Sequence, residues 1–441
     1  MILYQGKILQ NSRLEALIES LKDDVAIPLL HKEALSAAAV INACDKLAQR
    51  VLSGDFDNIV KPFLRLFNIS NEQFEKLVRL FTKESLAYKC SIELCDDERT
   101  IDNKVIRKRY PLGVLLHIAA GNVDVLPAYS VVEGLLSGNV NILKLPMGDS
   151  GLSVRLLYEL ITIEPLLSDY IYVFDVPSTE TETLKRLADL CDGIVVWGGD
   201  AAVKAARKLA DVNTKIISWG HKLSFAYAEP DAGDEQLQQL AESICNTNQL
   251  LCSSCQGIFV NTESREEQKQ FAIRFFEILK SVNKRSYPVD YGMKAKSAIN
   301  LYNERLESLS TKNEVLYEDG ISVLIREDKE LELSYLYRNV WIKRLPIQEL
   351  CTLKKYKSYL QTASVLTADA EKRKTITSVL ARIGVVRITS AGNMSRTICG
   401  EAHDGTYALR EYSRIVETEL FKKNQPISSD GLILYIEKEC P

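Results

Sequence analysis

Between Lys104 and Ser218 short apolar runs alternate with amphipathic stretches. The runs are "LGVLLHI", "NVNILKL", "YIYVFDVP", "GIVVW" and "TKIIS", and the stretches between them have the apolar spacing of helices. Strands that are this continuously apolar are buried on both faces, which indicates a parallel sheet covered by helices. The segment therefore predicts an α/β fold with a doubly wound parallel sheet, a fold that binds ligands at the carboxyl ends of its strands.

The flanking segments predict two further parts. "HKEALSAAAVINACDKLAQRVLSG" has helical spacing, and "YLQTASVLTADAEKRKTITSVLARIGVVRI" reads as strand, helix and strand. We expect a mainly helical N-terminal region at 1–103 and the doubly wound domain at 104–224. A second α/β domain is expected at 225–415, and a tail at 416–441 that returns to the first sheet or forms an oligomer interface.

Composition excludes several classes of partner. At 441 residues the chain is long enough for two or three domains, and its net charge of -4 gives no basic surplus for nucleic acid or an acidic membrane. The sequence shows neither a signal-peptide pattern nor an apolar run of about 18 residues. Ten cysteines in a chain of this length fit reduced thiols better than a disulfide framework. We expect a soluble, cytoplasmic protein without a membrane span.

Two cysteines three apart, Cys252 and Cys255, follow a predicted helix in "NTNQLLCSSCQGIFV". A zinc site needs about four ligands, and the only other close pair has a different spacing. A dithiol redox pair usually lies at a helix N-terminus, whereas this pair follows a helix whose apolar stripe comprises Leu237, Leu240, Ile244 and Leu251. The local pattern leaves two readings open: two buried thiols, or one nucleophile with a bystander.

The turn "VVWGGDAAVKAARK" places Gly198 and Gly199 between a predicted strand and a predicted helix. The dinucleotide fingerprint G-x-G-x-x-G does not occur in the chain. Bare backbone N–H groups in this turn could face a phosphate. The alternative is a turn that serves the fold alone.

Several segments together resemble one family. "PLGVLLHIAAGNVDVLPAYSVVEGLLSGNVNILKLP" is similar to the core of the aldehyde dehydrogenase superfamily, with an Asn-bearing turn, a helix, a "GN" and a strand that ends in Lys. "VVWGGDAAVKAAR", "SWGHKLSFAYAEPDA" and "NQLLCSSCQGIFV" follow in the same order, so the resemblance spans roughly residues 105–400. The cysteine loop, the helical N-terminal region and "GEAHDGTYALREYSRIVE" look most like LuxC-type fatty acyl-CoA reductases.

The resemblance assigns catalytic or cofactor-binding roles to five residues and leaves Cys255 without one. Cys252 becomes the nucleophile, because it lies seven residues before Phe259, and Cys255 becomes a bystander thiol. Asn122 matches the asparagine whose amide helps to hold the oxyanion, and a helix N-cap is compatible with that role. Lys144 matches the cofactor-binding lysine, and Gly198 and Gly199 match the turn that binds the pyrophosphate. The resemblance implies no metal. The resemblance assigns no role to His117 or His403.

The resemblance also implies a reaction. The Cys252 thiolate attacks an acyl thioester, coenzyme A leaves, and hydride from a reduced nicotinamide turns the enzyme thioester into an aldehyde. Members that oxidise aldehydes to acids carry a water-activating glutamate where this chain has Ser218, and His221 is the alternative base. The chain is therefore expected to work as a reductase.

The cofactor and the partners follow from the same resemblance. Members strict for NAD tend to carry a glutamate three residues after the lysine, where this chain has Met147, which favours NADPH. NADH stays possible because Asp149 is close. The implied partners are an acyl-CoA or acyl-protein substrate, an acyl-protein synthetase, and further copies of the chain in a homo-oligomer, either a dimer or a tetramer.

Two alternatives remain open from the sequence. One is another acylating or phosphoacyl reductase of the superfamily, such as a glutamyl phosphate type, which would also lack the glutamate base. The other is a non-catalytic subunit that binds a partner enzyme. A non-catalytic subunit would leave the combination of Cys252, Asn122 and Lys144 unexplained.

Overall fold

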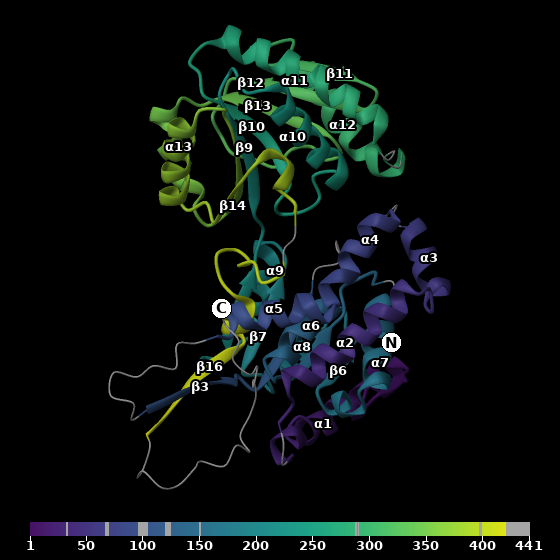
Figure 1. Cartoon of the computed structure of the whole chain (residues 1–441). Coiled ribbons are helices and arrows are strands. Elements are labelled where there is room, and N and C mark those ends of the chain that lie inside the picture. The colour runs from purple at the N-terminus through teal and green to yellow at the C-terminus, as the bar shows by residue number, and fades with distance from the viewer. Residues whose placement is uncertain are drawn as a thin grey trace. The chain divides into compact units, whose positions relative to one another are not determined.

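The structure is a computed structural model that describes residues 1–31, 34–66, 70–95, 105–119, 125–149, 151–286, 289, 291–396 and 399–419. The chain divides into two compact units (Figure 1). The first comprises Met1–Gly220 together with the segment from Ile398 onward, and the second comprises His221–Thr397. No helix in the described ranges is both long enough and apolar enough to cross a bilayer.

The first unit contains the doubly wound sheet that the apolar runs predict. Five parallel strands lie in the order β6-β5-β4-β7-β8, so the chain winds outward from β4 in both directions. Their bounds are β4 Val114–Ile118, β5 Val140–Lys144, β6 Ile171–Phe174, β7 Gly193–Trp197 and β8 Lys215–Trp219. The strand order reverses between β4 and β7, which is where a sheet of this kind binds its ligand.

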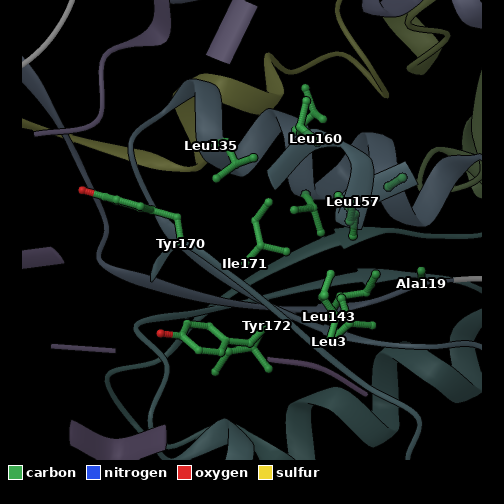
Figure 2. Packing of buried hydrophobic residues seen from close by; sticks show 14 of the residues in the cluster. Leu3, Ala119, Leu135, Leu143, Leu157, Leu160, Tyr170, Ile171 and Tyr172 are labelled. Atoms are coloured by element: carbon green, nitrogen blue, oxygen red, sulfur yellow. The ribbon is translucent and has the colours of Figure 1, made fainter. Parts of the chain in front are cut away.

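Helices cover this sheet as its amphipathic connections predict. The helices that link the five strands are α6 Leu126–Leu136, α7 Leu152–Ile163, α8 Thr181–Ala188 and α9 Asp200–Leu209. Figure 2 shows Leu135 of α6 and Leu157 of α7 near Ile171 of β6, while the neighbouring Tyr172 points to the opposite side. Successive strand residues face opposite sides of a sheet, so both faces of β6 are buried in the core.

The N-terminal region is part of this unit. Its helices are α1 Leu14–Asp24, α2 Ala37–Leu52, α3 Asp57–Leu66, α4 Asn71–Val78, the 3-10 helix η3 Arg79–Phe81 and α5 Lys83–Glu93. A hairpin of β1 Ile2–Tyr4 and β2 Lys7–Leu9 extends the sheet through an antiparallel pairing of β1 with β6. Buried side chains of α2 share one hydrophobic cluster with those of α6 and α7. The described helices of the region expected at 1–103 thus pack as one body with the sheet that follows them.

The C-terminal described residues also belong to the first unit. Residues 399–415, which the sequence analysis placed in the second domain, lie in the first unit instead. The physical reason is the short helix α14 Ala408–Glu411, whose Leu409 N–H donates to the buried Glu93 carboxylate of α5 at 2.9 Å. The strand β16 Ser413–Glu419 then pairs antiparallel with β3 Val105–Pro111 in a two-stranded ribbon.

The second unit is another α/β body with a seven-stranded sheet of order β11-β12-β13-β10-β9-β14-β15, parallel except for β11. Its strands are β9 Leu223–Ala228, β10 Cys255–Val260, β11 Glu314–Glu318, β12 Ile321–Arg326, β13 Asn339–Arg344, β14 Leu360–Leu366 and β15 Arg387–Thr389. Its helices are α10 Asp234–Thr247, α11 Arg265–Arg285, α12 Tyr291–Glu307 and α13 Ala370–Ile383. Separate hydrophobic clusters cover the two faces of the sheet, so its central strands are buried on both sides.

Candidate active site

The cysteine loop begins where the backbone forces α10 to end. Asn248 and Gln249 have φ angles of 48° and 63°, in the left-handed region that a helix cannot continue through. The turn at 250–254 follows, and β10 starts at Cys255. Leu251, which the sequence analysis placed on the buried stripe of this helix, lies in the turn and is exposed.

Two buried glutamine amides fix the shape of this loop. Gln249 donates to the carbonyls of Cys255 and Asn339 at 3.0 Å each, and its oxygen accepts from the Arg338 N–H at 2.9 Å. Gln256 donates to the carbonyls of Gln249 and Ser254 at 3.2 Å each. Buried amides with this many bonds are costly to disrupt, so the loop is held rigidly against the sheet.

Cys252 lies at the exposed tip of the loop. Its carbonyl accepts a hydrogen bond from the Ser224 hydroxyl of β9 at 2.7 Å, which fixes the backbone. Its Sγ accepts a hydrogen bond from Nε2 of Gln361, on β14, at 3.2 Å. An N–H bond donated to sulfur stabilises the thiolate over the thiol. Cys252 is thus an accessible thiol with a donor that favours its reactive form.

Cys255 differs from Cys252 in its exposure and in the hydrogen bond that its sulfur makes. Its side chain is 1% exposed and belongs to the core of the second unit, and its Sγ donates to the Gly257 carbonyl at 3.2 Å. Burial raises the pKa of this thiol to about 12. Cys255 is therefore a core thiol, as the resemblance implies. Among the described residues, no group of three or more His, Cys, Asp or Glu side chains could hold a metal ion.

The cysteine lies at the amino ends of the strands in its sheet. Ser224 and Gln361 stand near the starts of β9 and β14, and Cys252 precedes β10, which runs parallel to β9. Sequence reasoning did not identify Ser224 or Gln361. Both lie in segments that the sequence analysis used for the fold, but no local pattern marks either side chain as a partner of the cysteine, and Gln361 is 109 positions from Cys252 along the chain. Only the pairing of β9 with both β10 and β14 brings the three residues together.

Lys144 ends β5 in the first unit, on the edge where the sheet is expected to bind a ligand. Its side chain is 3% exposed, and its Nζ donates to the Ser178 hydroxyl at 3.0 Å. Burial lowers the pKa of this ammonium group, and the charge of Asp175 opposes that shift. The structure thus places a buried ammonium group at this strand end.

Gly198 and Gly199 form the turn between β7 and α9. Gly198 has a φ of 154°, and a Cβ there would lie 3.0 Å from Cβ of Ala202. A Cβ on Gly199 would meet no atom within 4 Å, so the backbone at the start of α9 is open. The turn needs a glycine for its backbone and leaves room for a group at the helix N-terminus.

An aromatic cluster that the sequence analysis missed flanks this turn. Trp197 ends β7 and Trp219 ends β8, and their ring centroids are 5.6 Å apart. The His403 ring packs against both, at 5.1 Å and 5.0 Å. β7 and β8 pair in parallel, which places Trp197 opposite Trp219. The sequence signal for this pair is a tryptophan at or just after the end of each of two consecutive apolar runs.

The remaining sequence candidates fall into different places. Asn122 lies outside the described residues. His117 is fully buried between Ser130 Oγ and Asn141 Oδ1, at 2.7 Å and 3.0 Å, and burial lowers its pKa to about 4. It is therefore a neutral core residue. Ser218 and His221 are exposed.

Comparison with known proteins decides the family. The acyl-CoA reductase (LuxC) model matches residues 33–415. The chain belongs to the LuxC family. This chain is 26% identical over 322 residues to the long-chain acyl-protein thioester reductase of Vibrio harveyi. It is 28% identical over 324 residues to the reductase of the same name from Aliivibrio fischeri. Each alignment covers 71% of this chain and 65% of the relative, so the chain spans less than two thirds of the length of these relatives. The family expected from the sequence is confirmed.

Solved structures show the fold of this LuxC-family chain. Glyceraldehyde-3-phosphate dehydrogenase GapN from Methanocaldococcus jannaschii, solved with NADP, matches with a TM-score of 0.73 and 14% identity over 94% of this chain and 96% of that chain. The putative aldehyde dehydrogenase PutA from Anabaena variabilis matches with a TM-score of 0.70 and 13% identity over 96% and 95%. The expected aldehyde dehydrogenase-like α/β fold is confirmed.

Proposed function

We propose that this LuxC-family chain reduces long-chain acyl thioesters to aldehydes through an acyl-enzyme on Cys252. The observation that carries the proposal is the pair of contacts at the cysteine loop. Of the two thiols in the motif, only Cys252 is exposed, and its Sγ accepts a hydrogen bond from Gln361. A nucleophilic thiol needs both access and a stabilised thiolate.

The chain's own residues then carry the acyl transfer. The Cys252 thiolate attacks the thioester carbonyl, a carbon–sulfur bond to Cys252 forms, and the bond to the departing carrier thiolate breaks. Asn122, by resemblance, donates its amide N–H to the oxyanion in this step and again when the thiohemiacetal forms. Collapse of the thiohemiacetal returns the electron pair to Cys252 and releases the aldehyde. The rigid loop held by Gln249 and Gln256 keeps Sγ in one position throughout.

The first unit fits a nicotinamide cofactor. Lys144 supplies a buried ammonium group at the ligand-binding edge of the sheet, and the open backbone at Gly199 begins α9, where a diphosphate gains from the helix N-terminus. These residues would hold the cofactor, which supplies a hydride to the acyl carbon when bound. Position 147 holds an exposed methionine in place of the carboxylate typical of NAD-strict members, which favours NADPH. Asp149 and Asp175 nearby leave NADH possible.

The direction of the reaction rests on Ser218. A hydroxyl is no general base at neutral pH, so this position cannot activate water against the enzyme thioester. The exposed Ser218 therefore favours transfer of the acyl group to hydride or to a thiol rather than to water.

The carrier of the acyl group has two forms in this proposal. The family is described as acyl-CoA reductases, whereas the relatives from Vibrio harveyi and Aliivibrio fischeri are named acyl-protein thioester reductases. We propose that the chain accepts the acyl group from coenzyme A and from a protein thioester, with an acyl-protein synthetase as the supplying partner. We also propose that the chain forms a homo-oligomer, either a dimer or a tetramer.

Intact mass measurement tests the function. Wild-type protein mixed with myristoyl-CoA and no cofactor is expected to gain one acyl group, which peptide mapping should place on Cys252. Adding NADPH should remove the adduct and release aldehyde. Cys252→Ala should abolish both, and Cys255→Ala serves as the matched control that retains them. An adduct on Cys255, or aldehyde production by Cys252→Ala, would contradict the proposal.

A further inference from the structure

The part of the second unit around Cys252 is rich in cations and poor in carboxylates. The segments that carry β9, β10, β14 and β15 are residues 221–228, 246–260, 351–366 and 378–396. None of them contains Asp or Glu, although these two residue types make up 59 of the 441 residues of the chain. Their cations are Lys222, Lys354, Lys355, Lys357, Arg382, Arg387 and Arg396. These segments thus carry positive charge that they do not neutralise themselves.

Two of these cations already serve the fold. Lys355 forms an ion pair with Glu330, whose two carboxylate oxygens each lie 2.6 Å from its Nζ. The Arg387 guanidinium donates to three carbonyls of the loop that follows β15. Lys357 and Arg382 are different, because both are exposed and neither forms an ion pair with a described carboxylate. Their charges are available to an anion from solution.

Lys222 lies close to the cysteine loop. It precedes β9 and stands two residues before Ser224, whose hydroxyl donates to the Cys252 carbonyl at 2.7 Å. Its Nζ donates to the carbonyl of Ser358, in the segment that leads into β14, at 3.0 Å. The ammonium group is therefore held at the amino ends of β9 and β14, the same edge of the sheet as the thiol.

Lys357 and Arg382 lie at the same edge and next to each other. Lys357 precedes β14, and its side chain packs against Gly384, where a Cβ would lie 2.6 Å from Cγ of Lys357. Arg382 is in the last turn of α13, two residues before Gly384. The helix runs back from the carboxyl end of β14 to the amino end of β15, so its last turn brings this cation to the edge that carries Cys252.

The distances suit one part of the proposed acyl donor. Neighbouring strands are ~4.8 Å apart, so β15, which is the third strand from β10, begins about 14 Å from the cysteine loop. The pantetheine arm of coenzyme A has about 13 bonds between sulfur and phosphorus and spans about 16 Å when extended. A thioester whose carbonyl lies at Cys252 can therefore place its phosphates among the cations of this edge.

We propose that Lys222, Lys357 and Arg382 form a basic rim that binds the phosphates of coenzyme A while its thioester lies at Cys252. The inference rests on the proposed function and extends it to the part of the donor that does not react. Coenzyme A carries a diphosphate and a 3′-phosphate, and each exposed contact between opposite charges changes affinity by about two- to fivefold. The rim should therefore raise the second-order rate of Cys252 acylation on the order of tenfold.

Three octanoyl thioesters with the same leaving thiol test the rim on the wild-type protein. Octanoyl-CoA, octanoyl-dephospho-CoA and octanoyl-pantetheine differ in the number of phosphates and not in the reacting group. The rate of adduct formation on Cys252 should fall in that order, and the differences should shrink at about 0.5 M NaCl because salt screens exposed charges. Equal rates for all three thioesters would overturn the rim and leave the proposed function intact. Acylation by none of them would refute the function itself.

Charge reversals on α13 and beside it provide matched variants. Lys357→Glu and Arg382→Glu should each lower the octanoyl-CoA rate on the order of tenfold and leave the octanoyl-pantetheine rate unchanged. Lys374→Glu is the control, because this exposed lysine lies on α13 eight residues before Arg382, about 12 Å along the helix. At about 0.15 M salt its charge is screened from the rim. Equal losses with both thioesters, or the same loss in Lys374→Glu, would overturn the proposal.

Discussion

Replacing Gln361 by methionine tests the reactivity of Cys252 most directly. The substitution keeps the length of the side chain and removes the N–H that Sγ accepts at 3.2 Å. A hydrogen bond to a charged group contributes about 1.5–3 kcal/mol. Water can replace part of this bond because Cys252 is exposed, so we take the lower end. A loss of about 1.5 kcal/mol of thiolate stabilisation corresponds to about a tenfold loss of the reactive thiolate at neutral pH.

The assay is alkylation by iodoacetamide at neutral pH. Exposed cysteines elsewhere, such as Cys95 and Cys351, also react, so the rate is followed by mass spectrometry on the peptide that contains Cys252. Gln361→Met should lower the alkylation rate of Cys252 at neutral pH about tenfold. Gln239→Met is the control, because that glutamine donates to Glu235 of its own helix. An unchanged alkylation rate in Gln361→Met, or an equal loss in both variants, would refute the reasoning.

Three further predictions concern other residues. If Ser218 leaves water unactivated, aldehyde with NADP⁺ should give a single burst of NADPH that coenzyme A converts into turnover; sustained carboxylate release would contradict this. With Met147 in place of a carboxylate, kcat/KM should be higher for NADPH than for NADH. A higher kcat/KM for NADH would contradict the proposed cofactor preference. The pKa of His117 is about 4 when folded, below its ordinary value of 6.5, so its contribution to stability is complete above pH 6.5 and is lost as the pH falls toward 4. Urea unfolding at pH 7.5 and pH 5 should show a loss of about 2 kcal/mol that is absent in His117→Gln.

The sequence by itself determined the order of strands and helices in the first sheet. The apolar runs from "LGVLLHI" to "TKIIS" became β4 to β8 because a strand buried on both faces must be apolar throughout. It also specified the fold family and, by resemblance, the cysteine proposed as the nucleophile. Local spacing alone left Cys252 and Cys255 equivalent, since both fall in the short stretch between a predicted helix and an apolar run.

Tertiary structure decided what distinguishes these two cysteines. β10 starts at Cys255 and carries that thiol into the core, where burial keeps it protonated, while the left-handed residues after α10 leave Cys252 at the exposed tip. The donor to its sulfur, Gln361, comes from a strand 109 positions away, because β9 pairs with both β10 and β14. The place of residues 399–415 likewise depended on contacts with α5 that no local pattern records. Strand pairing and burial act between distant segments, so a sequence read by local periodicity cannot supply them.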